Sequence, residues 1–358
     1  MALLGDKSYG EFNIATSGER QIGSTIKPML YYLAIENGFT PLTSFISQKE
    51  TFYIDHQAYK FQNYNNLYAN EKITLAYALA TSDNIYAVKT HLFLGEEELV
   101  KVILLMKKWP DIPYYVIGNG SNMLFTDEGY NGLIIKISNK MSDVDIHDLR
   151  IVAKAGAMLS RVAKLAYEEG LSGMERLSGI PGTIGGAVAM NAGAYGAEIK
   201  DIIVCAKVLD RETGEVFILE KDELDLSYRH SIIMEKSYIV IEVILELNHG
   251  KREDIKEEMD RCTGLRKEKQ PIEYPSAGST FKRPEGYFAG KLVQDAGLAG
   301  YTVGGACVSE KHCGFVINKG NATARDVLDV IEHCQREVKA QFGVELEPEV
   351  RILTKITK

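Results

Sequence analysis

The chain has 358 residues, of which 45% are hydrophobic and 25% are charged, and its formal net charge at pH 7 is −8. This composition is typical of a soluble globular protein and excludes a disordered, collagen-like or disulfide-scaffold chain. The negative charge argues against a nucleic-acid-binding protein, because phosphate backbones are bound by clustered positive side chains. The length predicts two or three domains.

The cysteines and the apolar segments indicate the compartment. Five cysteines occur without a C-x-x-C pair, so we expect reduced thiols, no disulfide framework and no zinc or other metal site. The longest apolar candidate, residues 238–247, is interrupted by Glu242 and Glu246 and alternates like a strand, so no membrane segment is predicted. The N-terminus lacks a signal-peptide pattern, and we therefore expect a cytoplasmic protein.

The first hundred residues and the rest of the chain differ in pattern. Residues 1–104 are rich in Tyr, Asn and Thr, and helical patterns at 26–37 and 73–94 predict a mostly helical fragment. A third helical pattern, at 96–108, stops at Trp109-Pro110. From residue 114, short β-rich runs alternate with glycine-rich turns, and one amphipathic helix is predicted at 159–169. The predicted strands are 114–117, 133–137, 151–155, 202–209, 216–219 and 238–247.

The last block of the chain begins with a charged helix predicted at 251–269. A short helix near 289–296 and strands at 301–303 and 314–318 follow. The final helix opens at Thr323, and Asp326 three residues later completes a capping-box pattern. A strand is predicted at 349–353.

An S-x-x-K motif, Ser24-Thr25-Ile26-Lys27, is followed downstream by Ser82-Asp83-Asn84. In acyl-serine enzymes the lysine amine takes the proton of the nucleophilic serine, and the S-D-N residues complete the polar site. With their flanking residues, these motifs resemble the transpeptidase domain of penicillin-binding proteins over about residues 1–100. The third motif of that family, K-T-G, is absent from the sequence. We therefore expect a fragment without acylation chemistry.

Two glycine-rich clusters stand out at residues 118–122 and 178–196. Glycines allow backbone N–H groups to converge on a phosphate, since no Cβ stands in the way. Neither cluster fits the Rossmann or P-loop pattern, and ordinary turn chemistry is the alternative. The clusters predict a dinucleotide diphosphate site made by Gly118, Asn119, Gly120, Ser121, Asn122, Ser178, Gly179, Pro181, Gly182, Thr183, Gly185, Gly186, Asn191, Ala192 and Gly193.

A third cluster lies at residues 274–284. It belongs to a wider resemblance that also includes the two glycine-rich clusters, the pair Tyr228-Arg229 and the terminal segment 346–351. Together they resemble the UDP-N-acetylenolpyruvoylglucosamine reductase family, in its shorter form, over about residues 110–353. The resemblance implies an α+β protein with a vanillyl-alcohol-oxidase-type FAD-binding domain at 105–250 and a smaller substrate-binding domain at 251–358. It also implies FAD as cofactor, NADPH as co-substrate, and reduction of UDP-N-acetylenolpyruvoylglucosamine to UDP-N-acetylmuramate in peptidoglycan synthesis.

The resemblance implies roles for individual side chains. Hydride addition to an unsaturated carboxylate builds negative charge, which a fixed cation and an acid must stabilise. By family position these are Arg229 and Glu349, and Ser279 is the proton donor. The substrate-binding residues implied are Tyr228, Lys282, Arg283 and His312.

One departure from the family concerns the cofactor. Family members begin with a first flavin subdomain, and transpeptidase-like sequence stands in its place here. We therefore expect an incomplete flavin site with lowered FAD affinity and weak activity. The alternatives are an acyl-serine penicillin-binding protein that uses Ser24 and a non-catalytic chimera; no obligate protein partner is inferred.

Overall fold

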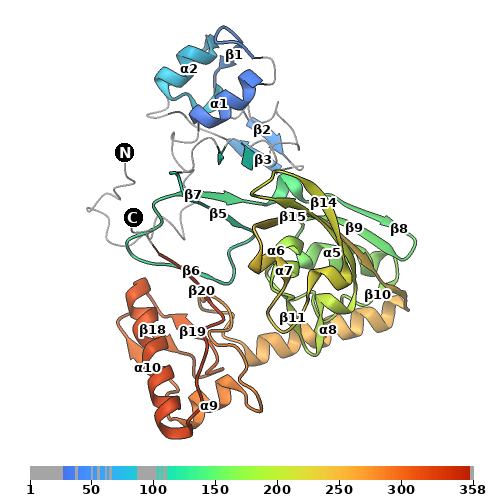
Figure 1. Ribbon diagram of the computed structural model, residues 1–358, viewed down its shortest axis with the longest axis vertical. Coiled ribbons are helices and arrows are strands. Elements are labelled where there is room, and N and C mark those ends of the chain that lie inside the picture. Colours follow the sequence, from blue (N-terminus) through green and yellow to red (C-terminus); the bar gives the residue numbers. More distant parts are fainter. Residues whose placement is uncertain are drawn as a thin grey trace. The chain divides into compact units, whose positions relative to one another are not determined.

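The computed structural model describes residues 27–36, 39–49, 51–54, 57–60, 63, 67–86, 103–104, 106–107 and 111–354. The contacts divide the chain into two compact units, one within Glu19–Ile112 and the other containing Pro113–Lys358 (Figure 1). Ser24 and most of the helix predicted at 96–108 lie outside the described residues.

The N-terminal unit contains helices and strands. Its elements are α1 (Lys27–Glu36), β1 (Ser44–Ser47), β2 (Thr51–Ile54), β3 (Gln57–Lys60), β4 (Glu71–Thr74) and α2 (Leu75–Thr81). β1 pairs with β4 and β2 with β3, both antiparallel. Among the described residues, these four strands accompany α1, α2 and further helical residues at 84–86, 103–104 and 106, so a mostly helical fragment is not clearly shown. The helix predicted from residue 73 begins at Leu75, because Ile73 and Thr74 pair with β1 and the Thr74 hydroxyl caps α2.

The second unit is built on a five-stranded antiparallel sheet in the order β14-β13-β15-β9-β8. These strands are β8 (Val144–His147), β9 (Arg150–Lys154), β13 (Ile203–Asp210), β14 (Val216–Glu220) and β15 (Tyr238–Glu246). Helix α6 (Ile184–Ala189) contacts β15 and β9. Ile151, Ala153, Val243 and Leu245 are buried, and their alternation with less buried neighbours gives the sheet one face toward the core.

Two parallel strand pairs bring distant segments together. β5 (Tyr114–Ile117) pairs with β7 (Leu133–Lys136), and β6 (Met123–Phe125) pairs with the final strand β20 (Arg351–Leu353). The first glycine cluster lies between β5 and β6. The end of the chain is thereby placed beside that cluster.

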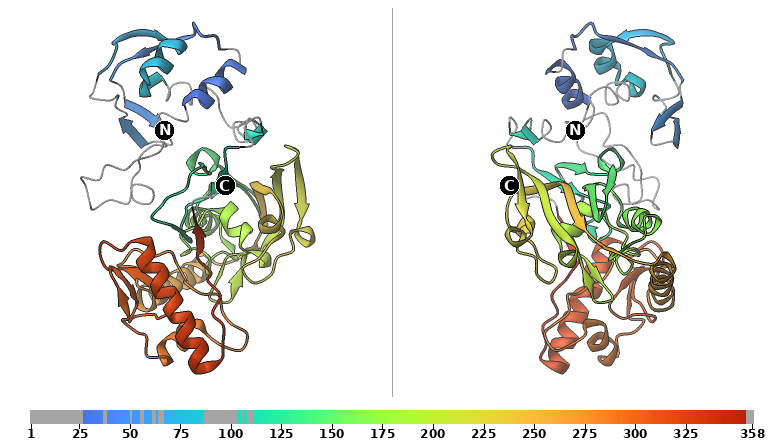
Figure 2. Two further views of the ribbon diagram at one scale, coloured as in Figure 1. Left: turned by 60° about the vertical axis from the view of Figure 1, so that its left-hand side comes forward. Right: turned by 90° about the vertical axis from the view of Figure 1, so that its right-hand side faces the viewer.

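The C-terminal part folds around a three-stranded antiparallel sheet, β17-β18-β19. The long helix α10 packs against this sheet and against α9 (Figures 1 and 2). The elements are α9 (Ala289–Asp295), β17 (Thr302–Val303), β18 (Ala306–Val308), β19 (Val316–Asn318) and α10 (Ala324–Phe342). Val293, Ala306, Val330, Ile331 and Cys334 belong to its buried core.

The remaining elements of this unit are one long helix and several short segments. Helix α8 (Arg252–Lys269) contacts α5 (Leu159–Glu168) and β10 (Leu171–Ser172). The others are β11 (Gly193–Ala194), β12 (Ala197–Glu198), α7 (Ile232–Glu235), β16 (Asn248–His249), and the 3-10 turns Asn139–Met141, Ile199–Asp201 and Lys221–Leu224.

The capping box predicted at Thr323 and Asp326 is confirmed. The Thr323 hydroxyl accepts a hydrogen bond from Asp326 N at 3.0 Å, and the Asp326 carboxylate accepts one from Thr323 N at 3.0 Å. All five cysteines are buried and free. Among the described helices, none is both long and apolar enough to cross a membrane. Within the same residues, His, Cys, Asp and Glu side chains form no group of three that could hold a metal ion.

Candidate active site

The site is centred on a buried ion pair between Arg229 and Glu349. Arg229 Nε lies 3.2 Å from Glu349 Oε2, and the two side chains are 16% and 8% exposed. The Arg229 Nε–H is not aligned for a hydrogen bond and has no other partner among the described residues. The sequence places these residues 120 positions apart, so the fold brings the predicted cation and acid together.

Backbone pairing sets the position of Glu349. Glu349 N donates to Thr280 O at 2.8 Å, and Lys282 N donates to Glu347 O at 2.8 Å. The segments 280–282 and 347–349 therefore run side by side. Ser279, the residue before Thr280, lies at the start of this pairing.

A second contact holds the Ser279 segment against the first glycine cluster. Asn122 Nδ2 donates to Ala277 O at 2.9 Å, and Gly278 has a φ of 81°, which an L side chain rarely adopts. In the described part of the chain, the Ser279 hydroxyl makes no hydrogen bond. It is therefore free to act on a ligand.

Burial controls the acid–base state of Glu349. Desolvation raises the pKa of the Glu349 carboxyl, and the interaction with Arg229 and the charge of Lys282 oppose the rise in the pKa. The net effect on the pKa is upward. Burial thus makes the Glu349 carboxyl easier to protonate than an exposed carboxyl.

The two glycine clusters meet. Asn119 Nδ2 donates to Pro181 O at 2.8 Å. A Cβ on Gly118 would lie 2.4 Å from Thr183 Oγ1, and one on Gly185 would lie 2.8 Å from Ala155 Cβ. Only glycine permits this approach, so the loops form a close-packed cradle.

A cavity of about 240 Å³ lies against this cradle. Of the predicted cofactor-binding residues, it is lined by Gly118, Thr183, Gly185 and Gly186. Apolar side chains cover another part of the wall, including Ile117, Ile137, Ile239 and Val240. The remaining predicted residues of the two clusters do not line it.

Three cations that sequence reasoning missed also line this cavity: Arg211, Lys236 and Arg351. Arg211 Nε donates to the Tyr114 hydroxyl at 3.1 Å, and its guanidinium lies 4.4 Å from the ring centroid of Tyr114. Arg351 could have been found, since it lies two residues after Glu349 in the terminal motif and alternation along a strand gives both the same face. Arg211 lies in a hairpin turn, and no sequence motif pointed to it as a cofactor-site residue.

These features fit a flavin dinucleotide. Glycine loops without a Cβ, cations for a diphosphate and an apolar wall for a ring are the groups such a cofactor requires. The buried Asn122 Oδ1 also has no hydrogen-bond partner within the described residues.

The predicted substrate-binding residues flank one segment, because Thr280 N donates to Gly314 O at 2.9 Å and so joins the His312 loop to the chain just before Lys282 and Arg283. The Tyr228 hydroxyl accepts from Arg283 N at 3.0 Å, and the Arg283 guanidinium lies 4.0 Å from the Phe288 ring centroid. Lys282 is paired with Glu347. His312 is partly buried, its Nδ1 accepts from Gly314 N at 3.0 Å, and burial lowers its pKa.

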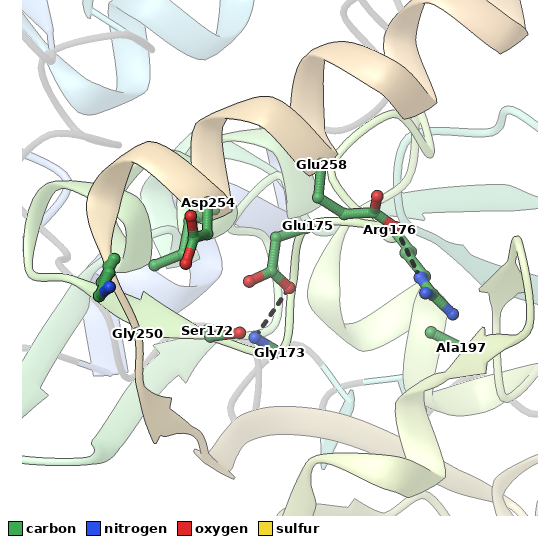
Figure 3. A pocket seen from close by; sticks show the side chains of 10 residues that line it. Ser172, Gly173, Glu175, Arg176, Ala197, Gly250, Asp254 and Glu258 are labelled. Atoms are coloured by element: carbon green, nitrogen blue, oxygen red, sulfur yellow. Dashed lines mark hydrogen bonds and ion pairs between the residues drawn. The ribbon is translucent and has the colours of Figure 1, made fainter.

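A larger cavity, of about 440 Å³, lies elsewhere, between β10 and α8 (Figure 3). Its walls carry Glu175, Arg176, Asp254 and Glu258, and Arg176 Nε lies 2.8 Å from Glu258 Oε1. None of the predicted site residues lines this cavity. The smaller cavity is therefore the better candidate, because the glycine loops converge on it.

The N-terminal unit has a polar cluster of its own. Lys27 Nζ donates to Ser82 Oγ at 3.1 Å and to Asn84 Oδ1 at 2.6 Å. Burial lowers the pKa of Lys27, and the charge of Asp83 opposes this lowering of the pKa. The lysine of the S-x-x-K motif and two residues of the S-D-N motif are thus together.

Matches to protein families identify the class. Residues 92–220 match the FAD binding domain, and residues 270–353 match the C-terminal domain of UDP-N-acetylenolpyruvoylglucosamine reductase. Residues 4–106 match the penicillin binding protein transpeptidase domain. The part of the chain that these two matches cover is therefore that of an oxidoreductase with an FAD-binding domain and a separate C-terminal domain.

Individual relatives narrow this class to one family. The chain is 53% identical over 260 residues to the UDP-N-acetylenolpyruvoylglucosamine reductase of Clostridium perfringens (strain SM101 / Type A), a match that covers 73% of this chain and 84% of the relative. It is 50% identical over 259 residues to that of Caldanaerobacter subterraneus subsp. tengcongensis, covering 72% and 85%. The crystal structure of the reductase (MurB) from Thermus caldophilus superposes with a TM-score of 0.60 at 36% identity, covering 70% of this chain and 89% of that one. The chain belongs to the UDP-N-acetylenolpyruvoylglucosamine reductase family.

Proposed function

We propose that this protein reduces UDP-N-acetylenolpyruvoylglucosamine to UDP-N-acetylmuramate, a step of peptidoglycan synthesis, with NADPH as the reductant. The observation that carries the proposal is the buried Arg229–Glu349 pair beside the Ser279 segment, in a chain 53% identical to reductases of that name. FAD, when bound, supplies the hydride-transfer chemistry. In the balanced reaction the enolpyruvyl double bond gains one hydride and one proton, and NADPH is oxidised to NADP⁺.

Arg229 and Glu349 stabilise the charge that this reaction creates. Hydride addition at one carbon of the double bond moves an electron pair onto the neighbouring carbon and the substrate carboxylate. The fixed guanidinium of Arg229 attracts that charge, and a protonated Glu349 donates a hydrogen bond to it. The raised pKa of Glu349 supports the second role, since an ionised carboxylate would repel the developing anion.

Ser279 delivers the proton. Its hydroxyl, which makes no hydrogen bond within the described residues, donates its proton to the carbon that carries the electron pair and regains a proton from solvent. Lys282 is engaged with Glu347 in this structure. Polarisation of the Ser279 hydroxyl by Lys282 therefore requires a different position of that ammonium group when substrate is bound.

Binding roles complete the proposal. The cofactor is held by the two glycine clusters, and the cavity at Gly118, Thr183, Gly185 and Gly186 supports this part of the assignment. The substrate is bound by Tyr228, Lys282, Arg283 and His312. A cytoplasmic location is supported by the five free cysteines.

We also propose that FAD binds more weakly here than in the relatives. The support is the match of residues 4–106 to a transpeptidase domain, where relatives carry their first flavin subdomain. One wall of the cofactor site would then be absent, and lower affinity and weaker activity follow.

The purified protein tests both proposals. A visible flavin spectrum gives the bound FAD per chain, and the absorbance of NADPH at saturating FAD reports turnover with the enolpyruvyl substrate. NADPH consumption that depends on this substrate supports the reductase. A flavin-loaded protein that never oxidises NADPH would overturn it, and a stoichiometric, tightly held flavin would overturn the weak-binding proposal.

A second candidate function is acylation of Ser24 by penicillin. The convergence of Lys27, Ser82 and Asn84 favours it. A fluorescent penicillin would label the protein covalently, the label would disappear in Ser24→Ala, and it would persist in the control Ser44→Ala. If the chain is a non-catalytic chimera, we expect neither covalent penicillin label nor bound flavin.

A further inference from the structure

The turn that carries Arg229 is held by the chain that follows α6. Asn191 Nδ2 donates to Ser227 O at 2.9 Å and to Glu198 Oε2 at 3.1 Å, and Asn191 Oδ1 accepts from Lys200 N at 2.9 Å. Asn191 is 0% exposed. Both amide hydrogens and one acceptor site are therefore used by the protein itself.

Two more contacts join the same segments. The Ser231 hydroxyl donates to Ala189 O at 2.5 Å, and Arg229 Nη2 donates to Gly193 O at 3.3 Å. Ser231 is fully buried. Residues 189–193 thus hold the turn 227–231 at its start, at its centre and at its end.

The turn needs this support because its centre is strained. Arg229 has a φ of 55°, in the left-handed region that is unfavourable for a long side chain. Ser227 N and His230 N each donate to the carbonyl of the other at 3.2 Å, which closes the turn. Such a conformation persists only where the surroundings over-determine it, and this occurs typically at functional sites.

We propose that Asn191 is a positioning residue: its amide holds the Ser227 carbonyl and so fixes the turn that aims Arg229 at Glu349. The sequence-based prediction gave Asn191 a direct cofactor contact. The positioning role is favoured because the side chain is buried and its two donors are spent on protein acceptors. The role itself needs no substrate, whereas its kinetic consequence rests on the proposed reductase function.

The variant Asn191→Gly tests the contribution of the Asn191 side-chain amide alone. Asn191 has a φ of 41°, and glycine tolerates this conformation, so the substitution removes the side chain without adding backbone strain. Asn321→Gly is the matched control, because Asn321 is an exposed asparagine with a φ of 55° in the loop before α10.

The first readout is the titration of Glu349, followed by NMR of carbon-13-labelled glutamate and assigned with Glu349→Gln. The charged groups that act on Glu349 are Arg229 and Lys282. If Arg229 shifts away, Glu349 loses its nearest counter-charge and its pKa rises. We expect this rise in Asn191→Gly and no change in Asn321→Gly. An unchanged Glu349 titration in Asn191→Gly would overturn the proposal, whether or not the protein proves to be a reductase.

The second readout is a double-mutant cycle with Arg229→Lys on kcat/KM for the enolpyruvyl substrate. A small displacement of a catalytic group lowers the rate by about tenfold to a hundredfold, and we expect a loss of this size in Asn191→Gly. Because Asn191 acts through Arg229, the double variant should be no slower than Arg229→Lys alone. Losses that multiply would contradict the proposal.

The unmutated protein provides a check that does not depend on the folding of any variant. The side-chain NH₂ of Asn191 should exchange slowly with solvent, and its nitrogen-15 shift should hardly change when FAD is added. A large shift on FAD addition would restore Asn191 to the cofactor contacts and overturn its positioning role.

Discussion

Arg229 Nε lies 3.2 Å from Glu349 Oε2, with both side chains largely shielded from water. Each charge therefore depends on the other, since water cannot replace a missing partner. Arg229 comes from a strained turn and Glu349 from the segment before the last strand, so the pair also joins two distant parts of the chain. Its properties can be tested without the cofactor.

Arg229→Met should destabilise the protein by about 3–5 kcal/mol at pH 7.5, because it leaves the Glu349 carboxylate buried without a counter-charge. The loss of Arg229 raises the folded-state pKa of Glu349 further above its unfolded value. A carboxyl with a raised folded-state pKa binds its proton more tightly when folded, so the destabilisation is full above that pKa and declines as the pH falls through it. Urea unfolding at pH 7.5 and at pH 5 measures this difference.

The control for that variant is Arg150→Met. Arg150 and Glu246 also form an ion pair, at 2.8 Å, but both side chains are half exposed. We expect almost no change in stability at either pH, since exposed pairs contribute little. An equal effect of the two substitutions would show that burial is not the source of the Arg229 effect.

Ser279→Ala should separate the two halves of the proposed reaction. Reduction of bound flavin by NADPH needs no proton from Ser279 and should keep its rate. Transfer to the enolpyruvyl substrate should slow by roughly 10²- to 10⁴-fold, the range for loss of a general acid. Stopped-flow absorbance measures each half-reaction, with Ser276→Ala, three residues earlier and exposed, as the control. Equal slowing of both half-reactions would remove Ser279 from the role of proton donor.

Local patterns predicted most elements from residue 114 onward. The capping box at Thr323 and Asp326 marked the start of α10, and the strand patterns at 202–209 and 216–219 marked β13 and β14. These signals depend on neighbours within a few residues, so sequence alone displays them. The domain boundaries and the individual site roles remain predictions.

The pairing of strands that lie far apart in the sequence could not be predicted from local patterns. The pairing of β20 with β6 joins residues more than 200 positions apart, and no local pattern specifies it. The sequence pattern at Ile73 and Thr74 predicts a helix, but in the structure these residues form a strand because they pair with β1. The proximity of Arg229 and Glu349 was expected from the family resemblance alone, because each residue taken singly resembles an ordinary surface charge.

Gly118→Ala should weaken FAD binding. The added Cβ would lie 2.4 Å from Thr183 Oγ1 and would push the two glycine loops apart. A misfit of this kind costs about 1–3 kcal/mol, which corresponds to roughly a tenfold to hundredfold rise in Kd. FAD titration by fluorescence quenching measures it. Gly264→Ala is the control, since its Cβ would meet nothing within 4 Å on helix α8; unchanged affinity in Gly118→Ala would show that the cradle does not hold FAD.

Asp127→Ala should loosen the N-terminus of α10. Asp127 Oδ1 accepts from Ala324 N at 2.8 Å and Oδ2 accepts from Arg325 N at 2.9 Å, so a residue just after β6 caps a helix nearly 200 positions later. These N–H groups have no partner inside the helix, and a carboxylate there also interacts favourably with the helix dipole.

The expected loss of stability in Asp127→Ala is about 1 kcal/mol, the usual effect of removing a cap. Urea unfolding should show a lower midpoint with an unchanged slope, and the exposed Asp145→Ala should show neither change. Because Asp127 and Thr323 satisfy different N–H groups of the same helix end, the double variant with Thr323→Ala should lose more than either single variant. A double variant no less stable than Thr323→Ala would mean that the carboxylate of Asp127 contributes nothing to holding α10.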